Sequence, residues 1–322
     1  PEPEAALMAK TVLSIRDLAV EIPTRAGIVK PVDGVSYDIE AGEILGVVGE
    51  SGAGKSMAGN AVIGLLSPPA HIAAGEIWLN GARIDQLTGE AMRRLRGKEI
   101  GMVFQDPLTS LNPLLTIGDQ LTETMLTHLP ISKSEAERRA VAALEEVGIP
   151  GAAQRIGSYP HEFSGGMRQR VVIAVALACG PKLVFADEPT TALDVTVQAQ
   201  VLDLLAEQQR ERYMAMILVT HDLGVVAGRA NEIAVMYAGR IVERAPTARL
   251  FASMKMPYTE ALMSAIPKLT DAPHTRLAAI GGRPPDLVNP PGGCAFAPRC
   301  PYARERCHTE VPELRAADDD PG

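Results

Sequence analysis

The first third of the chain alternates apolar and polar residues in a way that predicts β-strands. Residues 11–22 and 35–39 alternate at period two, and residues 43–48 form a short apolar run bounded by glycines. Asn80 and Gly81 divide the strand-like stretch 76–84 with a residue pair that favours a tight hairpin turn. An antiparallel layer is therefore expected to flank the core.

The middle third changes to helical spacing. Apolar residues recur every three or four positions over 116–129 and 134–147, and Ser134 is the expected N-cap of the second helix. We therefore predict a separate α-helical subdomain at about 106–163.

Helices then alternate with strands. Helical segments at 164–179 and 195–212 are interleaved with short apolar runs at 183–186, 215–219 and 233–236. This order is typical of a parallel sheet with crossover helices, so the predicted fold class is α/β.

Proline and glycine become frequent near the end of the chain. Residues 267–322 contain two Pro-Pro pairs and several glycines, which predicts an irregular C-terminal extension. The main domain is accordingly predicted to span residues 11–266.

Composition and charge limit the class of protein. The 322 residues are 46% hydrophobic and 22% charged, as in a soluble globular chain with a sizeable core. The net charge of −8 disfavours nucleic acid as a partner. The longest apolar run, residues 171–179, is about half the length that crosses a bilayer, so we expect no membrane span. Four cysteines are too few for a secreted domain stabilised by disulfides, so we expect a reducing cytosol.

Residues 49–56 fit the pattern G-x-x-x-x-G-K-[ST] between a predicted strand and a predicted helix. The glycines allow backbone N–H groups to turn toward phosphate oxygens, and the helix N-terminus adds the positive end of its dipole. Lys55 is expected to reach the outer phosphates and Ser56 to ligate Mg²⁺. The predicted phosphate-binding residues are Gly49, Glu50, Ser51, Gly52, Ala53, Gly54, Lys55, Ser56 and Met57.

A second signal is the predicted strand at 182–186, whose apolar residues 183–186 are followed by the two acids Asp187 and Glu188. A buried sheet presents carboxylates in this way at its carboxyl edge, beside a bound nucleotide. We expect Asp187 to hold the Mg²⁺ shell and Glu188 to orient or deprotonate the attacking water.

Four further motifs resemble those of ABC-transporter ATPases, in the order and spacing of that family across residues 11–245. Residues 164–170 (SGGMRQR), preceded by 159–163 (YPHEF), resemble the signature of that family. Gln105 resembles the glutamine of its Q-loop, residues 191–194 (TALD) resemble its D-loop, and His221 resembles its switch histidine.

The resemblance implies an ABC-type P-loop ATPase with a mixed β core, an antiparallel β subdomain, an inserted α-helical subdomain and an irregular cysteine-containing C-terminal extension. It implies ATP and Mg²⁺ as cofactors, with Mg²⁺ held by Ser56, Gln105 and Asp187. It also implies a catalytic role for Glu188, supported by Gln105 and His221. Such ATPases pair head to tail, so the residues implied to face the ATP of a second subunit are Ser164, Gly165, Gly166 and Asp194.

Residues 106–113 (DPLTSLNP) and the tail 293–307 resemble the ATPases of oligopeptide and dipeptide importers. The resemblance implies a peripheral subunit on the cytoplasmic face of the inner membrane. Its implied partners are two transmembrane permeases, a second ATPase that we expect to be a paralogue forming a heterodimer, and a periplasmic or extracellular peptide-binding protein. Two alternatives stay open: an importer of nickel or glutathione, and a soluble ABC-type regulator without a membrane partner.

Three cysteines, Cys294, Cys300 and Cys307, lie within 14 residues on a proline-stiffened loop. In a reducing compartment this spacing indicates a metal or iron–sulfur site before disulfides. We expect a [4Fe–4S] cluster, with zinc or plain thiols as alternatives. The fourth ligand stays open between His308, a partner and a residue beyond the present chain, because Cys179 is expected to be a packing residue.

Overall fold

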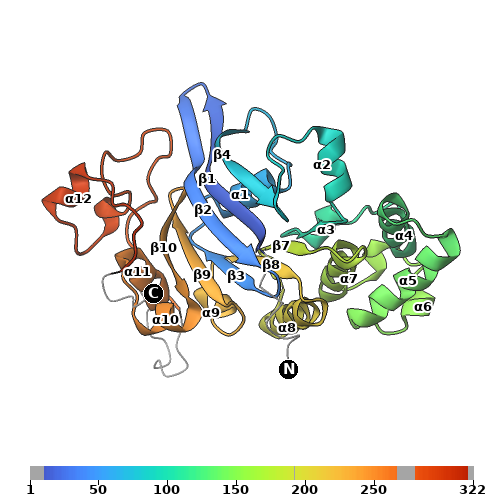
Figure 1. The fold of residues 1–322 in the computed structure, drawn as a ribbon. Coiled ribbons are helices and arrows are strands. Elements are labelled where there is room, and N and C mark those ends of the chain that lie inside the picture. The colour runs from blue at the N-terminus through green and yellow to red at the C-terminus, as the bar shows by residue number, and fades with distance from the viewer. Residues whose placement is uncertain (1–10, 192, 267–279, 318–322) are drawn as a thin grey trace, which may run out of the picture. The chain divides into compact units, whose positions relative to one another are not determined.

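The structure, a computed structural model, describes residues 11–191, 193–266 and 280–317 (Figure 1). These residues form two compact units, each built from separate stretches of the chain. The first unit contains residues 11–14, 38–44, 78–191 and 193–219, and the second contains 15–37, 45–77, 220–266 and 280–317. The chain passes from one unit to the other inside β-strands.

A parallel sheet forms the core of the first unit. Strands β6 (Ile100–Val103), β7 (Leu183–Asp187) and β8 (Ala215–Thr220) pair in that order, all in parallel. Every residue of β7 and β8 is buried, as is typical of parallel strands covered on both faces. Helix α7 (Gly165–Leu177) contacts β6, and α8 (Val195–Arg212) contacts α7. The predicted strands and crossover helices of this region are confirmed.

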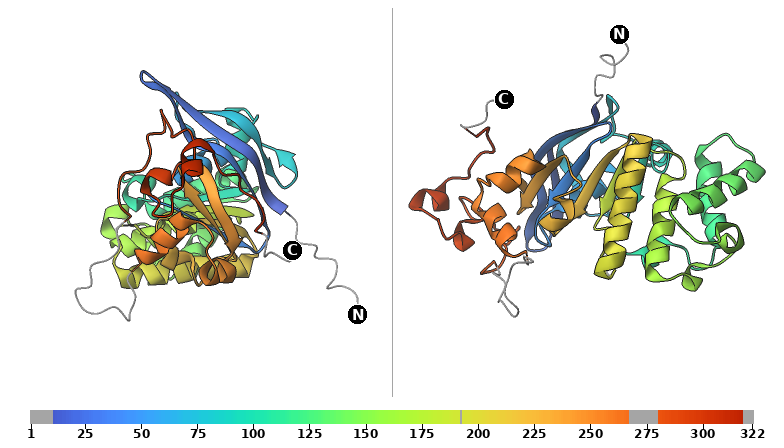
Figure 2. Two further views of the ribbon diagram at one scale, coloured as in Figure 1. Left: turned by 90° about the vertical axis from the view of Figure 1, so that its left-hand side faces the viewer. Right: turned by 90° about the horizontal axis from the view of Figure 1, so that it is seen from below.

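Four helices of the first unit, α4 (Ile117–His128), α5 (Lys133–Glu146), α6 (Ala152–Arg155) and α7, pack together (Figure 2). Ala136, Ala140 and Leu144 of α5 are buried at intervals of four residues, which places them on one face. The helices predicted at 116–129 and 134–147 are therefore confirmed. Two further helices, α2 (Gly89–Leu95) and α3 (Pro107–Ser110), precede them in the chain.

The start of α5 differs from the prediction. Ser132, rather than Ser134, is the N-cap residue, because its Oγ accepts a hydrogen bond from the N–H of Glu135 at 3.2 Å. Both serines precede the same apolar face, so the hydrophobic pattern does not distinguish them. The backbone geometry of the preceding loop decides which serine caps the helix.

The antiparallel layer is also confirmed. Strands β1 (Thr11–Thr24), β2 (Gly27–Glu40), β4 (His71–Leu79) and β5 (Ala82–Arg83) lie in the order β2–β1–β4–β5. Strands β4 and β5 pair antiparallel across Asn80 and Gly81, which have φ angles of 50° and 77°. Two successive left-handed residues are what a two-residue hairpin turn needs, and Asn-Gly is the pair that adopts them most readily.

In the second unit, β3 (Ile44–Val48) runs parallel to β9 (Glu232–Tyr237), and β10 (Arg240–Pro246) pairs antiparallel with β9. Helix α1 (Lys55–Val62) follows β3 in the chain. Helix α9 (Leu223–Val226) precedes β9, and α10 (Thr247–Ala252) and α11 (Pro257–Ser264) follow β10.

The described end of the chain adds a 3₁₀ turn, η3 (Ala297–Arg299), and α12 (Glu305–Thr309). Residues 267–279 and 318–322 of the predicted extension lie outside the described residues. Among the helices that the structure describes, none is long and apolar enough to cross a membrane.

We expect Leu144→Ala to lower the free energy of unfolding by about 2–5 kcal/mol, because Leu144 is fully buried in α5 and its loss leaves a cavity. Leu126→Ala in α4 is the control, since that side chain is 42% exposed and should change the free energy by less than about 1 kcal/mol. Urea unfolding followed by circular dichroism measures both. Equal effects of the two substitutions would contradict the packing described for α5.

Candidate functional site

Glycine is required at two positions of the loop between β3 and α1. A Cβ atom on Gly54 would lie 1.9 Å from the carbonyl oxygen of Pro31, and one on Gly49 would lie 2.2 Å from that of Met236. Gly54 also has a φ of 102°, in the left-handed region that favours glycine. A Cβ on Gly52 would meet none of the described residues within 4 Å, so there is open space at this point of the loop.

Lys55 is the first residue of α1, and its side chain folds back over the loop. The residue is only 5% exposed, and its Nζ donates hydrogen bonds to the carbonyls of Gly49 at 2.7 Å and Glu50 at 3.0 Å. Among the described residues, no side chain caps the N-terminus of α1. An ammonium group and a helix N-terminus at one glycine loop form an anion site. The residues present therefore fit the phosphates of a nucleotide.

Two carboxylates lie at the carboxyl end of β7, Asp187 as its last residue and Glu188 directly after it. Asp187 is 7% exposed, and Glu188 has a φ of 44°, a strained conformation that is frequent at functional sites. The N–H of Glu188 donates to the carbonyl of Val219 at 3.0 Å. Its Oε2 accepts hydrogen bonds from Gln105 Nε2 at 3.3 Å and from Thr191 Oγ1 at 3.2 Å. The Glu188 carboxylate is thus fixed in direction by its backbone and by two side chains.

The register of the parallel strands explains the contact between Gln105 and Glu188. Val103 of β6 pairs with Ala186 of β7, and the two functional residues follow these positions by two residues each. The carboxyl ends of adjacent parallel strands lie at one edge of the sheet, so the side chains meet there. Thr191 was missed as a partner of Glu188, because the sequence motif gives that threonine no separate role.

The predicted signature residues begin α7. Ser164 is the N-cap, and its Oγ accepts a hydrogen bond from the N–H of Met167 at 3.4 Å. A Cβ on Gly166 would lie 2.6 Å from Cγ1 of Val197 in α8, so glycine is needed there for the packing of the two helices. Ser164 and Gly165 are exposed, which leaves this end of α7 accessible.

Two further predicted residues lie at element ends. Asp194 caps α8, with its Oδ1 accepting from the N–H of Val197 at 3.0 Å, whereas His221 is exposed directly after β8. Ala192 of the predicted D-loop lies outside the described residues.

The predicted site residues divide between the two units. The second unit contains residues 49–57 and His221, whereas the first contains Gln105, Ser164, Gly165, Gly166, Asp187, Glu188 and Asp194.

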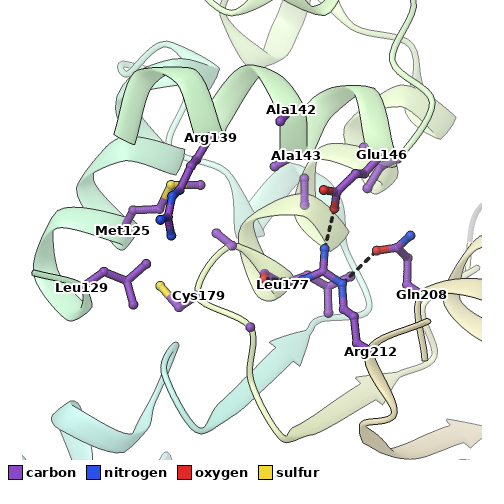
Figure 3. A pocket seen from close by; sticks show the side chains of 14 residues that line it. Met125, Leu129, Arg139, Ala142, Ala143, Glu146, Leu177, Cys179, Gln208 and Arg212 are labelled. Carbon is purple, nitrogen blue, oxygen red and sulfur yellow. Dashed lines mark hydrogen bonds and ion pairs between the residues drawn. The ribbon is translucent and has the colours of Figure 1, made fainter. Parts of the chain in front are cut away.

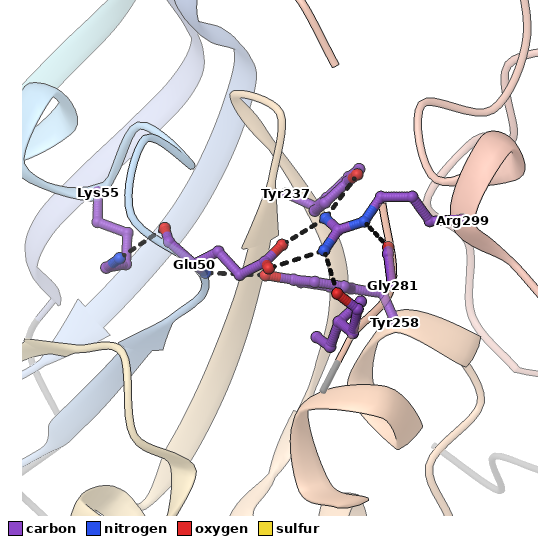
Figure 4. Close-up of polar contacts among 7 residues, drawn as sticks. Glu50, Lys55, Tyr237, Tyr258, Gly281 and Arg299 are labelled. Atoms are coloured by element: carbon purple, nitrogen blue, oxygen red, sulfur yellow. Dashed lines mark hydrogen bonds and ion pairs between the residues drawn. The ribbon is translucent and has the colours of Figure 1, made fainter. Parts of the chain in front are cut away.

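Glu50 in the phosphate loop is held by residues from near the other end of the chain (Figure 4). Its N–H donates to Tyr258 Oη at 2.8 Å. Its carboxylate accepts two hydrogen bonds from the Arg299 guanidinium, at 2.6 and 2.9 Å. Tyr258 and Arg299 were not predicted from the sequence, because no local pattern relates them to Glu50 across 208 and 249 positions.

The structure does not support the expected [4Fe–4S] cluster. Cys294, Cys300 and Cys307 are free and half-buried, and the N–H of Cys294 donates to the carbonyl of Cys307 at 2.8 Å. Within residues 11–191, 193–266 and 280–317, no group of three or more His, Cys, Asp or Glu side chains could hold a metal ion. The loop is instead organised by the buried Phe296 and by the contacts of Arg299.

The fourth cysteine, Cys179, lines a cavity of about 320 Å³ among α4, α5, α7 and α8 in the first unit (Figure 3). Met125 and Leu129 form an apolar wall, and Glu146 and Arg212 form an ion pair at the other side. Burial raises the pKa of the Cys179 thiol, so the uncharged form is favoured. These surroundings agree with the expected packing role.

Comparison with protein families gives two matches. Residues 32–191 match the family described as ABC transporter. Residues 242–307 match the family described as oligopeptide/dipeptide transporter, C-terminal region. The first match includes the phosphate loop, Gln105 and Glu188, and the second includes Tyr258 and Arg299.

Several individual proteins are similar along most of the chain. The oligopeptide transport ATP-binding protein OppD of Bacillus subtilis is 48% identical over 308 residues, which cover 95% of this chain and 86% of OppD. The dipeptide transport ATP-binding protein DppD of Escherichia coli is 45% identical over 307 residues, covering 95% and 94%. A dimeric ATP-binding cassette solved in a post-hydrolysis state with ADP and Pi gives a TM-score of 0.66 at 26% identity. That comparison covers 73% of this chain and 98% of the cassette.

We expect Gly54→Ala to weaken ATP binding by at least about 100-fold, because the added methyl group would overlap the Pro31 carbonyl and displace the loop. Gly34→Ala is the matched control: Gly34 also has a positive φ of 73°, but its Cβ would enter open space. The control should lose a little stability and keep its ATP affinity in titration calorimetry. Retained affinity in Gly54→Ala would contradict the geometry described for the loop.

Proposed function

The chain belongs to the ABC transporter family of ATPases, and we propose that it binds and hydrolyses ATP to power the import of oligopeptides or dipeptides. The observation that carries the proposal is the pairing, in one chain, of a phosphate loop closed by Lys55 with a Glu188 carboxylate held by Gln105. The names of relatives that match 95% of the chain support peptides as cargo.

Residues 49–57 bind the phosphates of ATP in this proposal. The Lys55 ammonium and the loop N–H groups offset the negative charge of the β- and γ-phosphates. Mg²⁺, when bound with ATP, neutralises charge on the same oxygens, and the residues proposed to hold it are Ser56, Gln105 and Asp187. Their hydroxyl, amide and carboxylate oxygens are the ligands that Mg²⁺ prefers.

Glu188 is the proposed general base. Its carboxylate accepts a proton from the attacking water, the water oxygen bonds to the γ-phosphorus, and the bond to the β–γ bridging oxygen breaks to release ADP. The contacts from Gln105 and Thr191 keep the carboxylate aimed in one direction before the water arrives. His221, exposed at the end of β8, is proposed to hydrogen-bond the γ-phosphate.

The accessible end of α7 supports a second anion-binding surface at Ser164, Gly165 and Gly166. We assign this surface, with Asp194, to the ATP held by a second ATPase subunit in a head-to-tail dimer, for which a paralogue is the proposed partner. The remaining proposed partners are two transmembrane permeases and an extracytoplasmic peptide-binding protein. The chain would then act as a peripheral subunit on the cytoplasmic face of the inner membrane.

Two regions carry these roles in the proposal. Residues 11–266 form the ATPase domain, with the helical subdomain at about 106–163, and residues 267–322 form the extension. The family match over residues 242–307 favours the importer over a soluble regulator. The names of the relatives favour peptides over nickel or glutathione as cargo.

We expect Glu188→Gln to lower ATP turnover by at least about 100-fold, because the amide cannot accept the proton of the attacking water. The dissociation constant for ATP should stay within about two-fold, since the phosphate loop is unchanged. Glu123→Gln, the same change on an exposed residue of α4, is the control and should keep full turnover. Phosphate release and fluorescent-nucleotide titration measure the two quantities. Unchanged turnover in Glu188→Gln would remove Glu188 from the catalytic step.

The partners are tested by affinity purification of the tagged chain from detergent-solubilised membranes. We expect two multi-span permeases and a second ATPase to co-purify, and peptide with its binding protein to stimulate ATP hydrolysis after reconstitution into vesicles. Glu188→Gln should recover the same subunits but show no stimulation, which separates assembly from catalysis. Recovery of the chain alone from the soluble fraction would contradict the importer.

A further inference from the structure

The phosphate loop is joined to the end of the chain by a two-point ion pair. Arg299 Nη1 donates to Glu50 Oε2 at 2.6 Å, and Nη2 donates to Oε1 at 2.9 Å. The Arg299 side chain is 3% exposed and that of Glu50 is 27% exposed, so water has little access to the guanidinium. A bidentate, largely buried pair of this kind fixes both position and orientation, unlike a surface salt bridge.

Arg299 is itself held from several sides. Its Nε donates to the carbonyl of Gly281 at 2.8 Å, and its Nη1 also donates to Tyr237 Oη at 3.2 Å. The guanidinium lies 5.8 Å from the ring centroid of Tyr237 and 5.9 Å from that of Phe296. The guanidinium therefore reaches Glu50 from a fixed position instead of from a mobile side chain.

An aromatic cluster attaches this segment to the second unit. Tyr237 of β9, Tyr258 of α11 and Phe296 before η3 have ring centroids 4.5 to 5.4 Å apart. Tyr258 and Phe296 are almost completely buried. Burial raises the pKa of Tyr258, which keeps its hydroxyl protonated. The same cluster thus supports Arg299 and places the Tyr258 hydroxyl against the N–H of Glu50.

Every polar group of Glu50 has a partner. Tyr258 accepts from its N–H, Arg299 donates to its carboxylate, and its carbonyl accepts from Lys55 Nζ at 3.0 Å. Lys55 is the residue that neutralises phosphate charge in the proposed function. A displacement of Glu50 would therefore move an acceptor of the Lys55 ammonium and alter the shape of the loop.

We propose that the C-terminal segment 280–307 sets the ATP-binding shape of the phosphate loop, with Arg299 as the positioning residue that acts through Glu50. The inference rests on the proposed function, because it concerns ATP held by this loop. It differs from a purely structural role, in which the Arg299–Glu50 pair would only attach the segment to the second unit.

The test compares ATP affinity with thermal stability in the full-length chain. Arg299→Gln should weaken binding of a fluorescent ATP analogue with Mg²⁺ by about ten-fold, and Glu50→Gln by a similar factor. The double substitution should bind within about two-fold of the weaker single variant, because both remove one interaction. Arg299→Lys keeps the charge but cannot form the two-point contact, so it should recover part of the affinity.

Arg244→Gln is the matched control. It removes the ion pair between Arg244 in β10 and Glu232 in β9, which lies in the same unit and has side-chain exposures of 28% and 33%. We expect this variant to lose stability but to bind ATP like the wild type. Tyr258→Phe provides a second route to Glu50, because it removes only the hydroxyl that accepts the Glu50 N–H. It should weaken ATP binding by about three-fold without disrupting the ring cluster.

The possible results distinguish failure of the proposed function from failure of the inference. Wild-type chain that does not bind ATP would overturn the proposed function, and the inference with it. Wild-type binding together with unchanged affinity in folded Arg299→Lys and Tyr258→Phe would overturn the inference alone. Equal effects of Arg299→Gln and Arg244→Gln on both stability and affinity would also overturn it, since they would show a general structural role.

Discussion

Lys55 is a lysine that is only 5% exposed, so its ammonium needs oxygen atoms around it, and this requirement governs the phosphate loop. The carbonyls of Gly49 and Glu50 supply two of them, which obliges the backbone to turn sharply around Lys55. That turn brings the loop against the Pro31 and Met236 carbonyls, where only glycine fits. The buried charge therefore fixes the residue types of the loop and makes it depend on the strands beside it.

The need of the Lys55 ammonium for oxygen atoms also links the phosphate loop to the C-terminal segment, through Glu50. Glu50 offers its carbonyl to Lys55, and its own N–H and carboxylate are held by Tyr258 and Arg299. These two residues are fixed by a buried aromatic cluster. The segment 280–307, which its composition predicts to be irregular, is thus held by the Arg299–Glu50 ion pair and by the aromatic cluster. The three cysteines of this segment have the spacing of a metal site, but among the described residues they do not form a group that could hold a metal ion.

In the first unit, strand pairing and backbone conformation position the Glu188 carboxylate at the end of a buried strand. Parallel pairing of β6 with β7 brings Gln105 to Glu188, and the left-handed backbone of Glu188 turns its side chain toward Gln105 and Thr191. The strained backbone of Glu188 is held by its position directly after the buried strand β7 and by the hydrogen bond of its N–H to the carbonyl of Val219. Rigidity of the sheet is therefore what allows a precise position at its edge.

The sequence by itself determined the features that depend on near neighbours. The glycine loop before α1, the Asn80-Gly81 hairpin and the alternation of strands with helices follow from local conformational preferences and hydrophobic period. These local preferences did not determine whether Ser132 or Ser134 caps α5, although the two serines are only two residues apart.

Only the tertiary structure decided the contacts of Gln105 with Glu188, 83 residues apart, and of Glu50 with Arg299, 249 residues apart. Such contacts depend on strand register and on the packing of distant side chains. A pattern along the sequence contains neither, which is why the contacts made by Glu188 and Glu50 became visible only in the fold.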